Sequence, residues 1–83
     1  MTYHVHVRVM PRDGLLDPQG QAIEQALHEL AFEGTSDVRV GRAIELQVAA
    51  ESESEAQSLA QRMCEKLLAN PVTEDFRIDV EPS

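Results

Sequence analysis

The sequence predicts an α+β fold, a two-layer sandwich in which a four-stranded antiparallel sheet carries two helices on one face. Two observations predict it. Four segments, one of them short, alternate apolar and polar residues, and two others repeat apolar residues at helical spacing. Their order along the chain is β-α-β-β-α-β. The 83 residues contain no linker or low-complexity stretch, so we expect one domain over residues 1–83.

The first predicted strand covers residues 3–9. Its odd positions form an apolar face, consisting of Tyr3, Val5, Val7 and Val9. Its even positions form a polar face that carries His4, His6 and Arg8. Alternation with β-branched residues is typical of a strand with one buried face. We expect the polar face to remain uncovered and available to a partner.

A helix is predicted to begin at Asp17, whose carboxylate can cap the free backbone N–H groups. Pro18 suits the first helical position, where no N–H is needed, and Gly20 follows it. The next apolar residues lie at helical spacing, namely Ile23, Ala26, Leu27, Leu30 and Ala31. Gly34 is the expected C-cap.

Residues 38–40 predict a short strand, and the alternation of Ile44, Leu46 and Val48 predicts another. Gly41 lies between them. The pair is interpreted as a hairpin, or as one bent strand with a bulge near Gly41.

A second helix is predicted from the capping box of Ser52 and Glu55, and it ends at Asn70 and Pro71. Alternating residues from Phe76 to Val80 then predict the last strand. The two halves of the chain, about residues 1–41 and 42–83, resemble each other weakly in sequence. The fold is therefore interpreted as a duplicated βαβ unit.

The charge disfavours two classes of partner. Lys and Arg number 7 against 15 Asp and Glu, which gives a net charge of −8. An acidic chain repels nucleic-acid backbones and anionic membrane surfaces. Because no spanning segment or export signal is visible, and because the single Cys64 cannot form an internal disulfide, we expect a cytoplasmic protein.

No catalytic constellation is evident in the sequence. Cys64 lies late in an apolar helix and has no base that can be paired with it. His4 and His6 share one strand face, a spacing that can chelate a metal. His28 and Cys64 lie on helices, so no third ligand is evident and we expect no metal site.

Three segments are together more specific than any of them alone. They are Asp17-Pro18-Gln19-Gly20, then Val38–Arg42 leading into Ile44-Glu45-Leu46, and finally Cys64–Val72 leading into Glu74-Asp75-Phe76. In order and spacing they resemble the PurS family, the small subunit of phosphoribosylformylglycinamidine (FGAM) synthase. The resemblance covers nearly the whole chain. Arg42 stands where that family often has lysine, and both residues are cations.

The resemblance implies a non-catalytic subunit in de novo purine biosynthesis. The complex converts formylglycinamide ribonucleotide (FGAR), glutamine and ATP to FGAM. The resemblance implies two partners, a large PurL-like synthetase subunit and a PurQ-like glutaminase subunit. The PurS-like chain bridges them, supports ammonia transfer, and is a homodimer or a tetramer. ATP and Mg are used by the complex, and no cofactor is expected on this chain.

Candidate interface residues follow from the matched segments, and Arg39 and Arg42 are the favoured ones because arginine is enriched at interaction hot spots. The full set is Asp17, Pro18, Gly20, Arg39, Gly41, Arg42, Asn70 and Pro71. An alternative function is a stand-alone small-molecule or metal-binding module that uses His4, His6 and Arg8 on the exposed sheet face. An enzyme acting alone is a third alternative.

Overall fold

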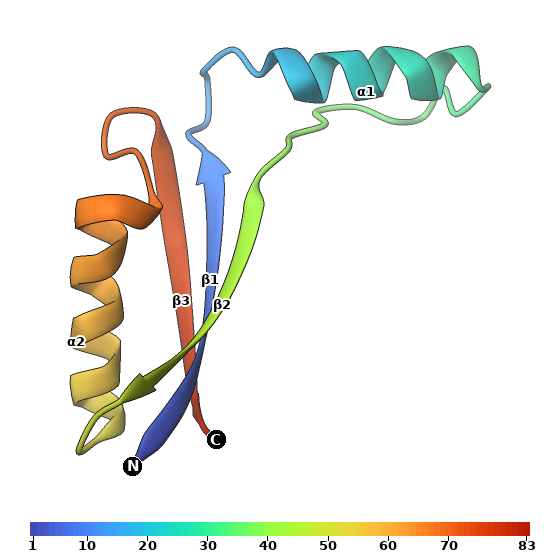
Figure 1. Ribbon diagram of the computed structural model, residues 1–83. Helices are drawn as coiled ribbons and strands as arrows, with labels where there is room; N and C mark the ends of the chain where they lie inside the picture. Colours follow the sequence, from blue (N-terminus) through green and yellow to red (C-terminus); the bar gives the residue numbers. More distant parts are fainter.

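The computed structural model describes residues 1–83. Strand β1 (Thr2–Pro11) is followed by helix α1 (Pro18–Glu29), strand β2 (Arg42–Ala49) and helix α2 (Glu53–Met63). A π-helical turn, η1 (Cys64–Leu68), continues α2, and strand β3 (Glu74–Pro82) completes the chain. The α+β class is therefore confirmed, although the layers differ from those expected (Figure 1).

The sheet has three strands in the order β2-β1-β3, and both pairs are antiparallel. The prediction of four strands is wrong, because residues 38–40 form no strand. The backbone N–H groups of Val38 and Val40 donate to side chains instead, at 3.1 Å to Glu24 Oε1 and 2.9 Å to Asp17 Oδ2. The hydrogen bonds that a strand ladder would use are thereby satisfied locally.

The core lies between α2 and one face of the sheet. The odd residues of β1 are buried there, as the alternation predicts. Small side chains on α2, Ala56 and Ala60, allow the helix to approach the strands closely. The ten buried core residues are Tyr3, Val5, Val7, Val9, Val48, Ala50, Ala56, Ala60, Cys64 and Ala69.

Helix α1 does not cover the sheet, so the expectation of two helices on one face is wrong. It extends away from the end of the sheet as an arm, and the following residues return alongside it (Figure 1). Its only buried residue is Gly20. The radius of gyration is 16.2 Å, against about 12 Å for a compact domain of this length. The single chain is therefore extended rather than closed around one core.

Side chains of α1 and of its N-cap, Asp17, hold the return segment, residues 35–40, against the helix. Besides the contacts of Glu24 and Asp17, His28 Nε2 donates to the carbonyl oxygen of Thr35 at 2.7 Å. The helix ends at Glu29, and Ala31, with φ of 74°, follows in the left-handed region. Gly34 is therefore not the C-cap. The left-handed backbone conformation after the helix is adopted by Ala31, for which it is less favourable than for glycine.

The boundaries of α2 agree with the capping analysis. Ser52 Oγ accepts from the backbone N–H of Glu55 at 3.1 Å, which confirms Ser52 as the N-cap. The helical residues end with η1 before Asn70 and Pro71, as predicted. Beyond β3, the N–H of Ser83 donates to the carbonyl oxygen of Thr2 at 3.1 Å. The two termini therefore lie together at the end of the sheet away from α1 (Figure 1). None of the helices is long and apolar enough to cross a membrane.

We expect Gly41→Ala to lower the free energy of unfolding by about 1–3 kcal/mol. A Cβ atom at Gly41 would collide with the Val9 carbonyl oxygen and with Met10 Sδ, so the start of β2 must shift away from β1. Gly34→Ala is the matched control, because a Cβ atom there meets nothing within 4 Å. Urea denaturation of both variants measures the difference. Equal stabilities would show that the Gly41 contact relaxes without cost.

Candidate functional site

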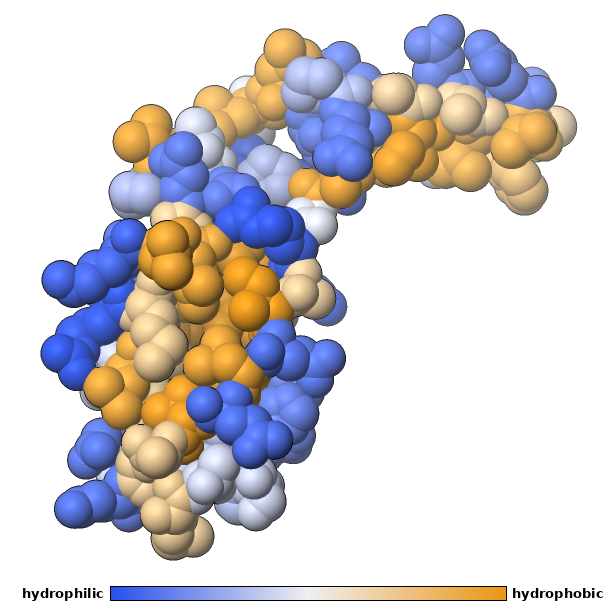
Figure 2. Space-filling model, viewed as in Figure 1, coloured by the Kyte–Doolittle hydropathy of each residue, from blue (hydrophilic) through white to orange (hydrophobic).

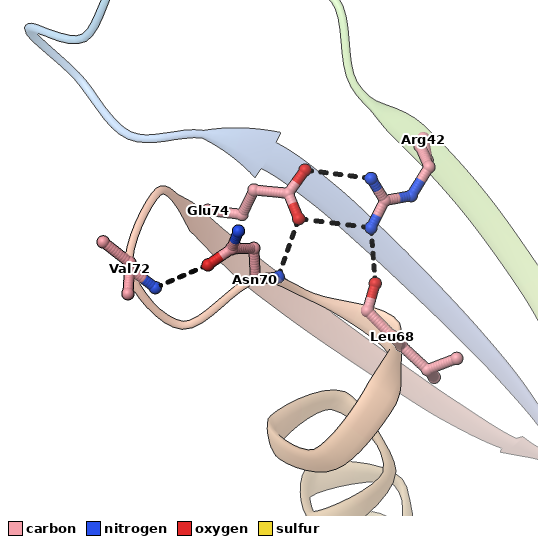
Figure 3. A network of polar contacts seen from close by, with 5 residues as sticks. All are labelled: Arg42, Leu68, Asn70, Val72 and Glu74. Atoms are coloured by element: carbon pink, nitrogen blue, oxygen red, sulfur yellow. Dashed lines mark hydrogen bonds and ion pairs between the residues drawn. The ribbon is translucent and has the colours of Figure 1, made fainter.

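The eight candidate interface residues gather at the end of the sheet from which α1 extends. They form two neighbouring groups rather than one. The first, called the α1 base, consists of Asp17, Pro18 and Gly20 with the backbone of Val38 and Val40. The second, called the Glu74 network, consists of Arg42, Leu68, Asn70, Val72 and Glu74 (Figure 3). The remaining three candidates, Arg39, Gly41 and Pro71, flank these groups.

In the α1 base, the Asp17 carboxylate joins the start of α1 to the end of the return segment. Its Oδ1 accepts from the N–H of Gly20 at 3.0 Å, and its Oδ2 accepts from the N–H of Val40 at 2.9 Å. These hydrogen bonds, with Gly20 the larger contributor, lower the pKa of Asp17, and the nearby Arg39 lowers it further. Gly20 is required here because a Cβ atom would collide with the Val38 carbonyl oxygen. The α1 base therefore fixes where the arm leaves the sheet.

In the Glu74 network, one carboxylate receives three hydrogen bonds (Figure 3). The N–H of Asn70 donates to Glu74 Oε1 at 2.7 Å. Arg42 donates from both terminal nitrogens, at 2.9 Å to Oε2 and 3.2 Å to Oε1. The Asn70 contact and then Arg42 lower the pKa of Glu74. Arg42 also donates to the carbonyl oxygen of Leu68, so the network ties β2 to the end of η1 and the start of β3.

Two candidates in this region have structural roles. The Asn70 side chain accepts from the N–H of Val72 at 2.9 Å and shapes the turn before β3. The Pro71 carbonyl oxygen accepts from Arg12 Nη2 at 2.7 Å. Since Arg42 is likewise occupied within the chain, these contacts account for all three residues without a partner.

Arg39 has a different setting. It lies beside a hollow of about 240 Å³ at the end of the open sheet face, and it shares that hollow with Arg8 and Arg77. Arg39 pairs with the exposed Asp13 at 3.0 Å. Arg8 and Arg77 are direct cross-strand partners. Sequence reasoning did not single out Arg77, because only the register of β1 with β3 places it here.

The open sheet face also carries a second cluster, called the histidine cluster, which consists of His4, His6, Glu45 and Glu81. The two imidazole rings stack with centroids 4.3 Å apart. Glu45 Oε1 lies 3.0 Å from His4 Nε2, and Glu81 Oε1 lies 3.1 Å from His6 Nε2. The expectation that no third ligand lies near the histidines is wrong. Sequence reasoning considered only His and Cys, whereas the additional donors are glutamates on the two neighbouring strands.

Cys64 does not have the surroundings of a nucleophile. It is fully buried in the core, and burial, together with the nearby Glu65, raises the pKa of its thiol. A thiolate is therefore disfavoured at this position.

Comparison with known proteins identifies the family. The family model described as PurS, phosphoribosylformylglycinamidine (FGAM) synthase, matches residues 4–82. The chain belongs to the PurS family. The PurS subunit of Bacillus subtilis (strain 168) is 44% identical over 79 residues, which cover 95% of this chain and 93% of that one. The PurS subunit of Mycobacterium leprae (strain TN) is 45% identical over 75 residues, with 90% and 91% covered.

Solved PurS structures share the fold. The B. subtilis PurS structure matches with a TM-score of 0.84, covering 96% of this chain and 99% of that chain at 44% identity. A chain in the structure of PurLQS from Thermotoga maritima matches with a TM-score of 0.89 at 31% identity, covering 98% and 99%. The match therefore extends to a PurS chain solved as part of a complex.

The Glu74 network predicts a pH-dependent contribution to stability. Because the pKa of Glu74 is lowered in the folded chain, its stabilisation is present above the ordinary value of 4.5 and is lost as the pH falls below it. Glu74→Gln should lower the free energy of unfolding at pH 7 by about 1–2 kcal/mol. Parent and variant should then converge towards pH 3, as measured by urea denaturation at each pH.

Glu29→Gln is the matched control, because the Glu29 side chain makes no hydrogen bond or ion pair and is exposed. It should leave stability within about 0.5 kcal/mol of the parent at every pH. A deficit in Glu74→Gln that stayed constant down to pH 3 would contradict the prediction, because it would then come from packing and not from charge.

Proposed function

We propose that this PurS chain is the non-catalytic bridging subunit of FGAM synthase in purine biosynthesis. It holds a PurQ-like glutaminase against a PurL-like synthetase and supports the transfer of ammonia, so that FGAR, glutamine and ATP are converted to FGAM. The observation that carries the proposal is the match over nearly all of both chains to the T. maritima chain in PurLQS. In this proposal ATP and Mg belong to the other subunits, and the complex works in the cytoplasm.

The physical requirement for such a bridge is clear. Ammonia released into water at neutral pH is largely protonated and is then no longer a nucleophile, so transfer requires an enclosed passage between the two sites. A subunit can meet this need by position alone. In this chain the hydrogen bonds of the α1 base and of the Glu74 network hold the arm and the end of the sheet in fixed positions, as a bridging subunit requires.

We further propose a homodimer in which the arm of one copy covers the sheet of the other. Arm residues such as Ile23, Leu30 and Phe32 are 41%, 67% and 58% exposed, although they are large and apolar. On the body, Ile44 and Leu46 of β2 lie beside the core but are only half-buried. Figure 2 shows apolar residues over the middle of the body and along the arm. Reciprocal exchange of arms would cover both surfaces in one symmetric contact.

For the partner subunits, the arginine-lined hollow is the proposed contact. Arg8, Arg39 and Arg77 outnumber the two carboxylates of the hollow, Asp13 and Asp75, on a chain whose net charge is −8. Guanidinium groups bind carboxylates in a bidentate way, so an acidic segment of the synthetase or the glutaminase would fit there. Arg39 is thus retained as an interface residue, whereas Arg42 is assigned to the Glu74 network.

Reconstitution tests the bridging role. Purified synthetase and glutaminase from the same source are mixed with and without this chain, and FGAM formation is followed with glutamine or with ammonium as the nitrogen donor. The chain should be required with glutamine and largely dispensable at high ammonium. If it changed neither activity nor co-elution of the other two subunits, the bridging role would be excluded.

Replacing Arg8, Arg39 and Arg77 together by alanine should weaken binding to the partner subunits by about tenfold or more. The reason is the loss of the charge-assisted hydrogen bonds proposed for the hollow. Binding is measured by titrating each form of the chain into the glutamine-dependent assay. Arg62→Ala, on the exposed side of α2, is the control and should bind normally. If the triple variant bound as tightly as the parent, the partner subunits would have to contact another surface of the chain.

The dimer has a separate test. Ile23→Asp combined with Leu30→Asp should shift the chain from dimer to monomer, because two charges would be buried against the apolar face of the partner. Sedimentation equilibrium measures the mass. Glu29→Gln again serves as the control and should remain dimeric. A double variant that stays dimeric would show that the arm is not the contact between copies.

A further inference from the structure

The histidine cluster brings donors from all three strands to one point on the open sheet face. His4 and His6 come from β1, Glu45 from β2 and Glu81 from β3. The register explains the meeting, because His6 pairs with Glu45 and His4 pairs with Glu81. The shortest contacts are diagonal to these pairs, from Glu45 to His4 at 3.0 Å and from Glu81 to His6 at 3.1 Å.

The hydrogen-bonding inventory of this cluster is unbalanced. His6 presents both ring nitrogens to carboxylates, Nδ1 to Glu45 at 3.6 Å and Nε2 to Glu81 at 3.1 Å. A neutral imidazole has one N–H donor and one lone pair. The ring nitrogen without a hydrogen has a lone pair that can coordinate a metal ion. A cation bound between the ring and the carboxylates would be coordinated by both kinds of donor.

The donor geometry is suited to a cation. One ligand atom from each of His4, His6 and Glu81 lies within 4.8 Å of the other two. Tetrahedral zinc with bonds of about 2.0–2.1 Å requires donors about 3.3 Å apart. The side chains of His6 and Glu81 are 43% and 63% exposed, so rotamer changes can close the difference without moving the strands.

The donor set also selects the class of metal. Two imidazoles with carboxylates suit first-row transition ions such as Zn²⁺, whereas Mg²⁺ and Ca²⁺ prefer oxygen donors alone. The acidic chain, with a net charge of −8, favours cations in general.

We propose that His4, His6 and Glu81, with Glu45 as the fourth donor, form a Zn²⁺-class site on the open sheet face that clamps β1 to both of its neighbours. The site is separate from the bridging role, and the role does not require it. It lies on the face opposite the core and α2, because the odd residues of β1 point to that helix and the even residues point away.

Isothermal titration of the full, tag-free chain with ZnCl₂ tests the proposal. The parent should bind one Zn²⁺ per chain. His4→Ala, His6→Ala and Glu81→Gln should each weaken Zn²⁺ binding about tenfold or more, because each substitution removes one of the metal ligands. His28→Ala is the matched control, since His28 lies on α1 and contacts only the Thr35 carbonyl oxygen.

Two further measurements distinguish the loss of the metal site from a variant that fails to fold. Co²⁺ should give the visible absorption of a tetrahedral complex with the parent and with His28→Ala, and this absorption should be lost in His6→Ala. Zn²⁺ should raise the Tm of the parent by several degrees but should not raise that of His6→Ala, whereas MgCl₂ should raise neither. Equal Zn²⁺ affinity in the parent and the His4→Ala and His6→Ala variants, or no binding by the parent, would overturn the site.

Discussion

The pairing of β1 with both of its neighbours determines most of what this chain can do. Because β1 lies between β2 and β3, its odd residues are directed to α2 and its even residues to the open face. A shift of one residue in register would exchange these faces, placing His4 and His6 in the core and valines in solvent. The same register aligns Arg8 with Arg77 and the histidines with Glu45 and Glu81. One central strand thus separates a dry side that stabilises the fold from a polar side that is available for binding.

The second constraint is the small size of the chain. One helix on a three-stranded sheet leaves apolar residues of β2 half-buried, and the other helix, α1, does not cover the sheet of its own chain. The Asp17 and Glu74 carboxylates compensate locally, since each joins segments that hydrophobic packing does not hold together. The exposed apolar residues of α1 and the half-buried ones of β2 are the surfaces on which the proposed homodimer depends.

The sequence predicted most of the elements, because each is determined by local chemistry. The alternation in β1, the cap at Asp17, the cap at Ser52 and the end of α2 before Asn70 all appear in the structure. Two errors were not local. The first concerns Val38 and Val40, which have the alternation of a strand although their N–H groups donate to Glu24 of α1 and to its N-cap Asp17.

The apolar stripe of α1 indicated that one side of this helix should be buried, but periodicity does not say which surface buries it. The glutamates of the histidine cluster were missed for a similar reason. Glu45 and Glu81 follow His4 by 41 and 77 positions in the chain, and only the strand register places them next to the two imidazole rings. The family resemblance was independent of these errors, because it depended on segments in order along the chain.

The neighbouring termini have a practical consequence. Both chain ends lie at the end of the sheet opposite the arm, joined by the hydrogen bond between Ser83 and Thr2. Chain ends that lie close together tolerate fusion and circular permutation. A fluorophore or a surface anchor at either end would therefore be attached at one corner of the molecule, at a distance from the arm and from the arginine-lined hollow. The neighbouring termini are therefore a suitable position at which to label or immobilise the chain.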